Sequence, residues 1–155
     1  MKQTDDVSNV KSLGSGSTTY PNQGGCDPSV LEKFPNKFLQ RRYKVRFETF
    51  EFTSLCPKTG QPDFAKITIV YSPDEFCIES KGLKLYLFSY RTEGSFMETI
   101  VNNILTHLVE LVKPYRMTVH GDFAPRGGIG LIVDACYIRD SGVVIGTERM
   151  ETKCT

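Results

Sequence analysis

Alternating apolar and polar residues predict the first strand of the domain close to residue 45. In YKVRFETFEF, which begins at Tyr43, the side chains of Tyr43, Val45 and Phe47 point to one face and the charged residues between them to the other. A period of two is typical of a half-buried strand. The segment AKITIVY at 65–71 predicts a second strand. Because the two strands are neighbours along the chain, we expect an antiparallel pair.

Two helices are predicted between residues 78 and 113. IESKGLKLYLFSYR at 78–91 fits helical spacing and strand alternation almost equally, and we favour a helix because Lys and Leu are good helix formers. SFMETIVNNILTHLVELVK at 95–113 has one continuous apolar face. Ser95 and Glu98 have the spacing of a capping box at its start, and Pro114 ends it. The apolar face comprises Ile100, Val101, Ile104, Leu105, Leu108, Leu111 and Val112.

Two further strands are predicted after the helices. RMTVHGDFA at 116–124 alternates, with Met117, Val119 and Phe123 on one face, and IGLIVDACYI at 129–138 follows the turn signal PRGG. Two strands, two helices and two strands make an α+β fold, with an antiparallel sheet and both helices on one of its faces. The edge strands of such a sheet expose unpaired backbone N–H and C=O groups. Pairing these edges with other subunits in a ring would satisfy them.

Length and composition indicate one domain and exclude several classes of protein. Residues 1–25 are polar and predict a flexible arm, and residues 26–155 predict a single domain. The net charge of +1 favours neither nucleic acid nor a membrane surface as a direct partner. Apolar runs fall short of the ~18 residues that span a bilayer, and the first residues lack a signal peptide, so we expect a cytoplasmic protein.

The cysteines predict free thiols and no metal site. Their number is odd and no C-x-x-C pair occurs, which argues against a zinc site or a dithiol redox motif. In a reducing cytoplasm we expect no disulfides. Packing is the expected role of Cys77, and no acid or base partner is evident for three others. The five cysteines are Cys26, Cys56, Cys77, Cys136 and Cys154.

Cys56 is the one cysteine whose surroundings suggest chemistry. It lies in CPKTGQP, a segment whose prolines and glycine predict a loop. Lys58 is expected to favour the reactive thiolate. Asp63 stands at the start of the next strand, where a carboxylic acid can protonate the atom that gains charge when a thiolate adds to an electron-poor carbon. On this pattern alone, a packing cysteine and a capping aspartate are the more common explanation.

Several motifs resemble one family of enzymes. EFTSLCPKTGQPDFA at 51–65 is similar to the active-site segment of the 7-cyano-7-deazaguanine reductases, the nitrile reductases of queuosine biosynthesis. The family signature E-S-K-S-x-K-L-Y resembles ESKGLKLY at 79–86. VLEKFPNK and LGSGSTTY resemble the family's N-terminal segment, and FAPRGG its hairpin turn. The likeness runs in order from about Leu13 to Gly128 and suggests a short, single-module member.

The resemblance implies a fold, an assembly and a reaction. The family has the tunnelling fold, in which ββααββ subunits form rings whose sheets make a barrel, and this is the element order that the alternation predicts independently. Short members form two stacked pentamers with active sites between subunits, so a homodecamer is expected. The implied substrate is 7-cyano-7-deazaguanine, whose nitrile is reduced to a primary amine, and the implied cofactor is NADPH.

The resemblance also implies a role for each motif residue. Cys56 would add to the nitrile carbon and form a thioimide, and Asp63 would donate a proton to its nitrogen before hydrides arrive from NADPH. The implied substrate-binding residues are Ile78, Glu79, Ser80, Met97 and Glu98, and the implied cofactor-binding residues are Lys81 and Lys84. Alternatively, Glu79 caps a helix, the two lysines form a solvated face, and Glu98 belongs to the capping box.

Met97 departs from the family pattern. The family usually has Phe-His-Glu where this chain has Phe96, Met97 and Glu98. Methionine has no titratable proton, and loss of acid–base help can cost ~10²–10⁴-fold in rate. His107, expected on the polar side of the second helix, and His120, expected on the outward face of a strand, are not evident substitutes. Two alternatives therefore stay open, an amidine-forming nitrile transferase and a deazaguanine-binding protein that has lost catalysis.

Overall fold

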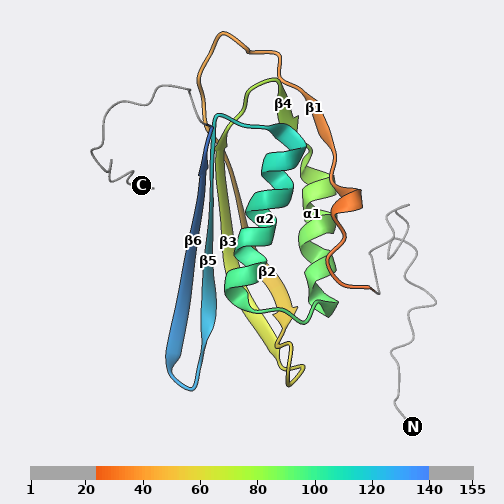
Figure 1. Cartoon of the computed structure of the whole chain (residues 1–155), viewed down its shortest axis with the longest axis vertical. Helices are drawn as coiled ribbons and strands as arrows, with labels where there is room; N and C mark the ends of the chain where they lie inside the picture. The colour runs from red at the N-terminus through yellow and green to blue at the C-terminus, as the bar shows by residue number, and fades with distance from the viewer. Residues whose placement is uncertain (1–23, 140–155) are drawn as a thin grey trace, which may run out of the picture.

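A four-stranded antiparallel sheet with two helices on one face forms the domain (Figure 1). The structure is a computed structural model and describes residues 24–139. The predicted α+β architecture, with both helices on the same side of the sheet, is confirmed. Most of the predicted arm at 1–25, and the domain beyond Arg139 with Cys154, lie outside the described residues. The strands, in sheet order, are β2 (Val45–Leu55), β3 (Pro62–Ser72), β5 (Arg116–Arg126) and β6 (Ile129–Ile138), and the helices are α1 (Ser80–Ser89) and α2 (Met97–Val112).

Shorter elements complete the domain. β1 (Lys33–Pro35) pairs with β4 (Phe76–Ile78) in a separate two-stranded sheet, which the sequence pattern did not indicate because three residues are too few to show a period. Single turns of 3-10 helix, η1 (Pro28–Val30) and η2 (Tyr90–Thr92), precede β1 and follow α1. No helix within residues 24–139 is long and apolar enough to cross a membrane.

The core fills the space between the helices and the sheet. In α2, Ile100, Ile104 and Leu108 have no exposed surface, which confirms the apolar face predicted for this helix. Leu105 and Leu111, which the spacing assigns to the same face, are only partly buried at its margin. On β5 the predicted alternation is also confirmed, because Met117, Val119 and Phe123 are all buried. Other large side chains that are fully buried are Tyr71, Tyr86, Tyr90, Ile67 and Ile69.

A β-bulge in β2 changes which of its side chains face the helices. Thr49 lies opposite Ile67, but Phe52 lies opposite Ala65, so Phe50 and Glu51 together oppose one residue of β3. An extra residue reverses the alternation of a strand. The pattern that begins at Tyr43 therefore holds as far as Thr49, after which Phe52 and Ser54 take the buried positions and Phe50 is exposed.

A second bulge lies near the end of β5. Phe123 pairs with Leu131, whereas Arg126 pairs with Ile129, so Ala124 and Pro125 oppose a single residue of β6. Proline has no N–H to give to a ladder, and a bulge accommodates it. The predicted turn PRGG is therefore shorter than expected, since its first two residues continue the strand and the turn itself is Gly127 and Gly128. The extra residue also turns Arg126 to the face that carries the helices.

The capping box predicted from Ser95 and Glu98 is wrong. The N-cap of α2 is Phe96, which has extended backbone and no side-chain capping bond. The preceding connection runs alongside the end of β2 instead, because Leu55 N–H donates to the Glu93 carbonyl and Ser95 N–H donates to the Leu55 carbonyl. These bonds hold Ser95 one residue too early to cap the helix.

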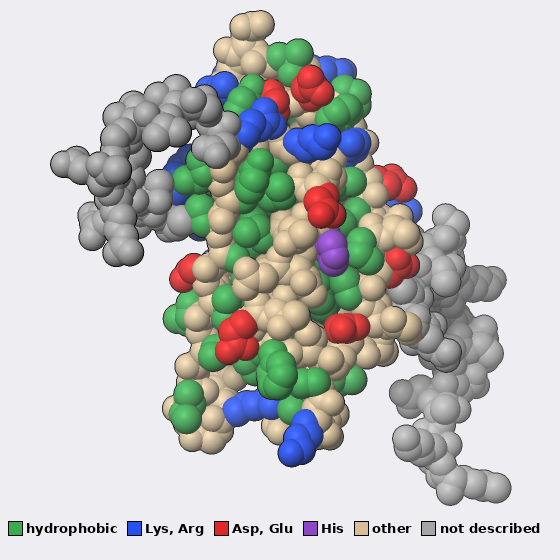
Figure 2. All heavy atoms as spheres, viewed as in Figure 1, with side chains coloured by type: hydrophobic (Ala, Val, Ile, Leu, Met, Phe, Trp, Pro, Cys, Tyr) green, Lys and Arg blue, Asp and Glu red, His purple; other side chains and the backbone are tan. Residues whose placement is uncertain are grey.

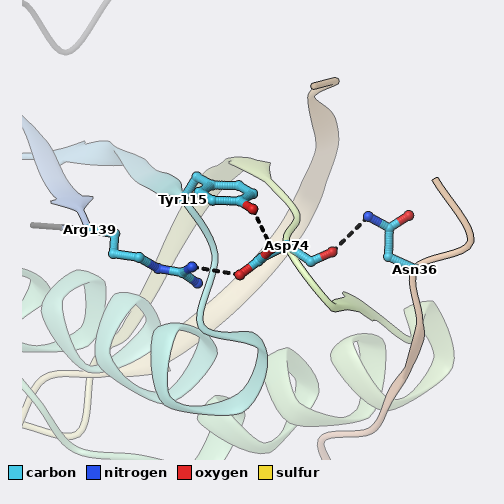
Figure 3. Close-up of polar contacts among 4 residues, drawn as sticks. All are labelled: Asn36, Asp74, Tyr115 and Arg139. Atoms are coloured by element: carbon cyan, nitrogen blue, oxygen red, sulfur yellow. Dashed lines mark hydrogen bonds and ion pairs between the residues drawn. The ribbon is translucent and has the colours of Figure 1, made fainter. Parts of the chain in front are cut away.

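Asp74 ties several segments together at the end of the molecule where β4 lies. Its carboxylate accepts hydrogen bonds from Tyr115 Oη and from Arg139 Nη1, the latter at 2.6 Å, and its carbonyl accepts from Asn36 Nδ2 at 2.7 Å (Figure 3). The two contacts to its carboxylate lower the pKa of Asp74, with Tyr115 as the largest cause. The loop before β2, the turn after β3, the start of β5 and the end of β6 are thereby joined at one residue.

We expect Ile104→Ala to destabilise the protein by about 2–5 kcal/mol, because it leaves a cavity in a fully buried part of α2. Asn103→Ala, an exposed position on the same helix, is the matched control and should change stability by less than about 0.5 kcal/mol. Chemical denaturation at one fixed protein concentration measures both, since association between chains would also raise stability. Equal unfolding midpoints for the two variants would contradict the position given to Ile104.

Candidate active site

Cys56 lies at the base of the tight loop that joins β2 to β3. Its N–H donates to the Gln61 carbonyl at 2.8 Å, and its carbonyl accepts from Gly60 N–H at 3.0 Å. Gly60 has φ +69°, a conformation that glycine adopts without strain. The predicted loop is confirmed, and it leaves the Cys56 thiol partly exposed at the end of the sheet.

The loop holds Cys56 in its reactive form. Hydrogen bonds lower the pKa of the Cys56 thiol to about 6, chiefly from the Thr59 hydroxyl, then from the backbone N–H groups of Thr59 and Lys58, and then from Arg126. Most of this thiol is therefore thiolate at neutral pH. The sequence predicted that Lys58 favours the thiolate, but the contact that does so is made by its backbone N–H and not by its ammonium group.

Asp63 is a buried carboxylate beside this loop. It lies near the start of β3, as predicted, and only 5% of its surface is exposed. Its Oδ1 forms an ion pair with Arg126 Nη2, and the same guanidinium hydrogen-bonds to Cys56. Ser54 lies directly across the ladder from Asp63, and its hydroxyl is buried without a hydrogen-bond partner among the described residues. The structure thus brings the two predicted catalytic residues to one cation.

Sequence reasoning missed Ser54, Thr59 and Arg126 as parts of this site. Thr59 is an ordinary loop residue, and Ser54 belongs to a strand whose alternation would place it on the other face. Arg126 was visible only as part of the turn signal PRGG. The one available clue was Pro125, since a proline inside a strand commonly marks a bulge that re-aims its neighbours.

Met97 and Glu98 begin α2 at the same end of the molecule as the Cys56 loop (Figure 1). The hydrogen bonds between Leu55 and the connection before α2 hold the two segments together. Met97 is partly buried against the core, and Glu98 is exposed. Within residues 24–139 the Glu98 carboxylate has no hydrogen-bond or ion-pair partner, so it is available to a ligand.

Ile78, Glu79 and Ser80 lie at the opposite end. The N–H of Ile78 donates to the Tyr71 hydroxyl at 2.9 Å, and Tyr71 is eight residues along β3 from Asp63. At about 3.3 Å per residue, that stretch of strand is ~26 Å long. Within one chain, therefore, the structure does not bring these predicted substrate-binding residues to Cys56.

Glu79 caps α1, as the alternative interpretation held. Its carboxylate accepts from Lys81 N–H at 2.9 Å and from Gly82 N–H at 2.7 Å. These bonds lower the pKa of Glu79, with the Lys81 N–H as the largest cause. The side chain is therefore ionised and fixed in direction, and it is also still partly exposed.

A cavity of about 380 Å³ lies between α1 and β2. Of the predicted cofactor-binding residues, Lys84 lines this cavity, whereas Lys81 is exposed on α1 outside its lining. Arg91 adds a second cation, and its guanidinium lies 4.3 Å from the centre of the Phe88 ring. The lining thus combines two cations and an apolar floor with two carboxylates of β2, Glu48 and Glu51. The lining also includes Ser80, Leu83, Leu87 and Phe47.

Basic side chains gather at both ends of the helix-bearing face, and acidic side chains lie across its middle and also among the basic ones at the upper end (Figure 2). The lower end in this view is the one that carries the β2–β3 loop. Neither end bears an extended basic surface, in agreement with the net charge of +1.

Comparison with known proteins identifies the family. A family model described as "QueF-like protein" matches residues 62–141. The NADPH-dependent 7-cyano-7-deazaguanine reductase of Desulfovibrio desulfuricans is 49% identical over 139 residues, which cover 90% of this chain and 83% of that protein. The enzyme of the same name from Bacillus subtilis is 51% identical over 130 residues, 84% of this chain and 78% of that protein. The chain belongs to the QueF-like family.

The fold of the QueF-like family is confirmed by a solved structure. An archaeosine synthase described as QueF-Like, in its apo form, matches with a TM-score of 0.56 over 60% of this chain and 91% of that chain. At 22% sequence identity, this likeness shows the fold alone. The resemblance inferred from the motifs is confirmed, and so is the fold of the single subunit that it implied.

Position 97 of this QueF-like chain is a methionine where a histidine was expected. Neither of the chain's two histidines lies where it could take that place within the same chain. His107 Nδ1 lies 2.7 Å from the Tyr86 hydroxyl, so His107 faces α1 and is partly buried, and the prediction that it lies on the polar side is wrong. It stands ten residues beyond Met97, about 15 Å along α2. His120 forms a 2.7 Å contact with Asp134, on strands β5 and β6.

The remaining cysteines of the described chain take no part in this site. Cys77 is buried in β4, with the Tyr43 hydroxyl 3.5 Å from its sulfur, which confirms the packing role predicted for it. Burial raises the pKa of the Cys26 thiol, so it is protonated at neutral pH. Cys136 is exposed on β6. Within residues 24–139 no group of His, Cys, Asp and Glu side chains is arranged to hold a metal ion.

We expect Thr59→Val to shift alkylation of Cys56 to higher pH. The substitution removes the hydroxyl that does most to lower the Cys56 pKa to about 6, so the thiolate fraction at pH 6–7 must fall. Iodoacetamide labelling of Cys56 as a function of pH, read by peptide mass spectrometry, measures the midpoint.

Lys58→Ala is the matched control for Thr59→Val, because it removes the ammonium group and keeps the backbone N–H that contacts the sulfur. Its midpoint should stay close to that of the wild type. A larger shift for Lys58→Ala than for Thr59→Val would contradict the assigned contacts.

Proposed function

We propose that this chain is an NADPH-dependent 7-cyano-7-deazaguanine reductase, which converts the nitrile of its substrate to a primary amine. The observation that carries the proposal is the pair of Cys56 and Asp63 on one guanidinium, in a chain about half identical to enzymes of that name. Covalent capture of a nitrile requires a nucleophile and a proton donor, and a stable thiolate beside a buried carboxyl group supplies both. The assigned relatives favour this activity over the amidine-forming and non-catalytic alternatives.

Cys56 is the proposed nucleophile. Its thiolate adds to the nitrile carbon, so a C–S bond forms, one bond of the triple bond breaks, and the electron pair moves to nitrogen. Asp63 is the proposed donor of the proton that this nitrogen takes, which leaves a neutral thioimide. Capture in this form converts a poor hydride acceptor into a good one.

The chain's residues fit the cofactor that the reaction needs. Lys84 and Arg91 line the cavity beside α1 and would hold phosphate groups, and the apolar side chains of the cavity would cover a flat ring. Lys81 would approach from the exposed side of α1. When bound there, NADPH would supply the hydrides of the reduction, one from each of two successive NADPH molecules.

We further propose that each active site is shared by two copies of the chain. Glu98 lies at the Cys56 end, whereas Glu79 lies some 26 Å away along β3, a separation longer than the bicyclic substrate. If both acids bind the amidine-like edge of the deazaguanine, Glu79 with Ile78 and Ser80 must come from a neighbour. In that arrangement Glu98 and Met97 contact the substrate from the same subunit as Cys56.

A ring supplies the neighbour. β2 and β6 are the open edges of the sheet, and exposed apolar residues such as Phe50, Ile132 and Ile138 lie on these strands. Pairing β6 of one copy with β2 of the next would continue the sheet into a barrel. We propose the decamer of two stacked pentamers expected from the motifs. A cytoplasmic location is part of the proposal, since Cys56 must stay a free thiol.

The activity is tested by NADPH absorbance with 7-cyano-7-deazaguanine as substrate. We expect two NADPH consumed per amine formed, and Cys56→Ala should abolish turnover because no other thiol contacts Asp63 or Arg126 in the described chain. Cys136→Ala, at an exposed position on β6, is the matched control and should keep most of the activity. Reduction of the nitrile by Cys56→Ala would show that the covalent route is wrong.

Sharing of the site predicts complementation between two inactive variants. Cys56→Ala and Glu79→Gln each remove one side of the site, so co-refolding them in equal amounts should restore activity at about a quarter of the interfaces. Glutamine keeps a carbonyl oxygen that can still cap α1. The control mixture, Cys56→Ala with Asp63→Asn, damages the same side twice and should stay inactive. Restoration in that control, or none in the first mixture, would contradict the shared site.

A further inference from the structure

The guanidinium of Arg126 lies between the two proposed reacting groups. Nη2 pairs with Asp63 Oδ1 and donates to the Gln61 carbonyl at 3.4 Å, and the guanidinium also hydrogen-bonds to Cys56. One cation therefore faces a thiolate and a carboxylate at once. An arginine in this position stabilises the negative charge on both groups.

Backbone geometry aims Arg126 at this point. The bulge at Ala124 and Pro125 shifts the register of β5 by one residue, which turns Arg126 to the face on which Asp63 lies. The two glycines that follow, Gly127 at φ +56° and Gly128 at φ +80°, then close a short hairpin turn. The position is thus held by strand pairing on one side and by a tight turn on the other.

Two buried polar atoms beside Asp63 lack partners. Among the described residues, neither Arg126 Nε nor the Ser54 hydroxyl has a hydrogen-bond partner. Ser54 has no exposed surface and pairs directly across the ladder with Asp63. A buried hydroxyl without a hydrogen bond destabilises the folded protein. Its presence here therefore indicates that it is hydrogen-bonded in another state of the site. A protonated Asp63 carboxyl group could donate to it.

We propose that Arg126 is a positioning residue that holds the Asp63 carboxylate beside Cys56 by an ion pair and adds to the stabilisation of the Cys56 thiolate, so that the proton on the captured substrate comes from solvent through Asp63 and not from the Cys56 thiol. The inference rests on the proposed function.

The proton balance follows from these charges. The thiolate brings no proton when it adds to the nitrile carbon, and the nitrogen that receives the electron pair needs one. Asp63 is a carboxylate while it is paired with Arg126, so it must take up a solvent proton before it can deliver one. Ser54 can accept the hydrogen bond of the protonated carboxyl group. Each adduct therefore consumes one proton from solvent, and the thioimide forms without change of redox state.

Other charged groups surround the site but are directed elsewhere or lie in solvent. Lys58 belongs to the Cys56 loop and its side chain is exposed. Glu93, in the connection before α2, accepts from the N–H of Cys26 at 3.1 Å. Glu98 is exposed in the first turn of α2. Arg126 is thus the cation of the described chain that contacts both reacting groups.

The first test needs no substrate. Iodoacetamide labelling of Cys56 against pH should have its midpoint near pH 6 in the wild type, and Arg126→Met should move it upward by on the order of one pH unit. Arg126→Lys keeps the positive charge but loses the planar guanidinium with its several N–H donors. Its labelling midpoint should lie between those of the wild type and Arg126→Met. Arg46→Met, at an exposed arginine of β2, is the matched control and should leave the midpoint unchanged.

A double variant keeps the test decisive if Arg126→Met alone does not fold. Arg126→Met leaves a buried carboxylate without its partner, so Arg126→Met with Asp63→Asn removes the unpaired charge as well. Its Cys56 midpoint should also rise, because the thiolate has still lost its cation. An unchanged midpoint in a folded single or double variant would overturn the proposal.

The second test follows proton uptake as the nitrile is captured without NADPH. In weakly buffered solution at pH 6.5, the wild type should take up most of one proton per adduct and Arg126→Met less than half of one. Capture by the wild type with no uptake would overturn the proposal. If no adduct forms at all, the proposed function fails while the labelling result still decides the role of Arg126, so the two failures are distinct.

Discussion

Asp63 is a carboxylate with almost no exposed surface at the end of a central strand, and such a charge is costly unless it is paired. Its partner, Arg126, comes from a strand 63 residues later in the chain, so the pairing depends on the whole sheet. The order β2-β3-β5-β6 places β3 beside β5, and the bulge in β5 turns the guanidinium to the correct face. The same cation then reaches Cys56. Strand pairing, charge burial and reactivity are thereby linked at one contact.

Most of the activation of Cys56 nevertheless comes from its own loop. The Thr59 hydroxyl and two backbone N–H groups contribute more to the low Cys56 pKa than Arg126 does. A loop of six residues can supply such donors without help from distant strands. Arg126 adds what the loop cannot, which is a charge shared with the proposed proton donor. The proposed nucleophile and the proposed acid therefore share one cation.

The length of β3 separates the two halves of the proposed site. Asp63 and the Tyr71 that holds Ile78 occupy opposite ends of the strand, and the helices run between the same two ends. No movement of side chains closes a distance of this order. In the proposed ring, a second copy of the chain would do so without any change of fold, at the open edges of β2 and β6.

By itself the sequence determined the element order, the long apolar face of α2, the Cys56 loop and the family. Each of these rests on local periodicity, on turn residues or on short motifs that need no knowledge of distant contacts. The start of α2, the facing of Ser54 and Arg126, and the partner of His107 were decided only by tertiary structure. Bulges shift the phase of a strand by one residue, and neither the bonds that displace Ser95 from the cap nor the Arg126–Asp63 pair leaves a local pattern.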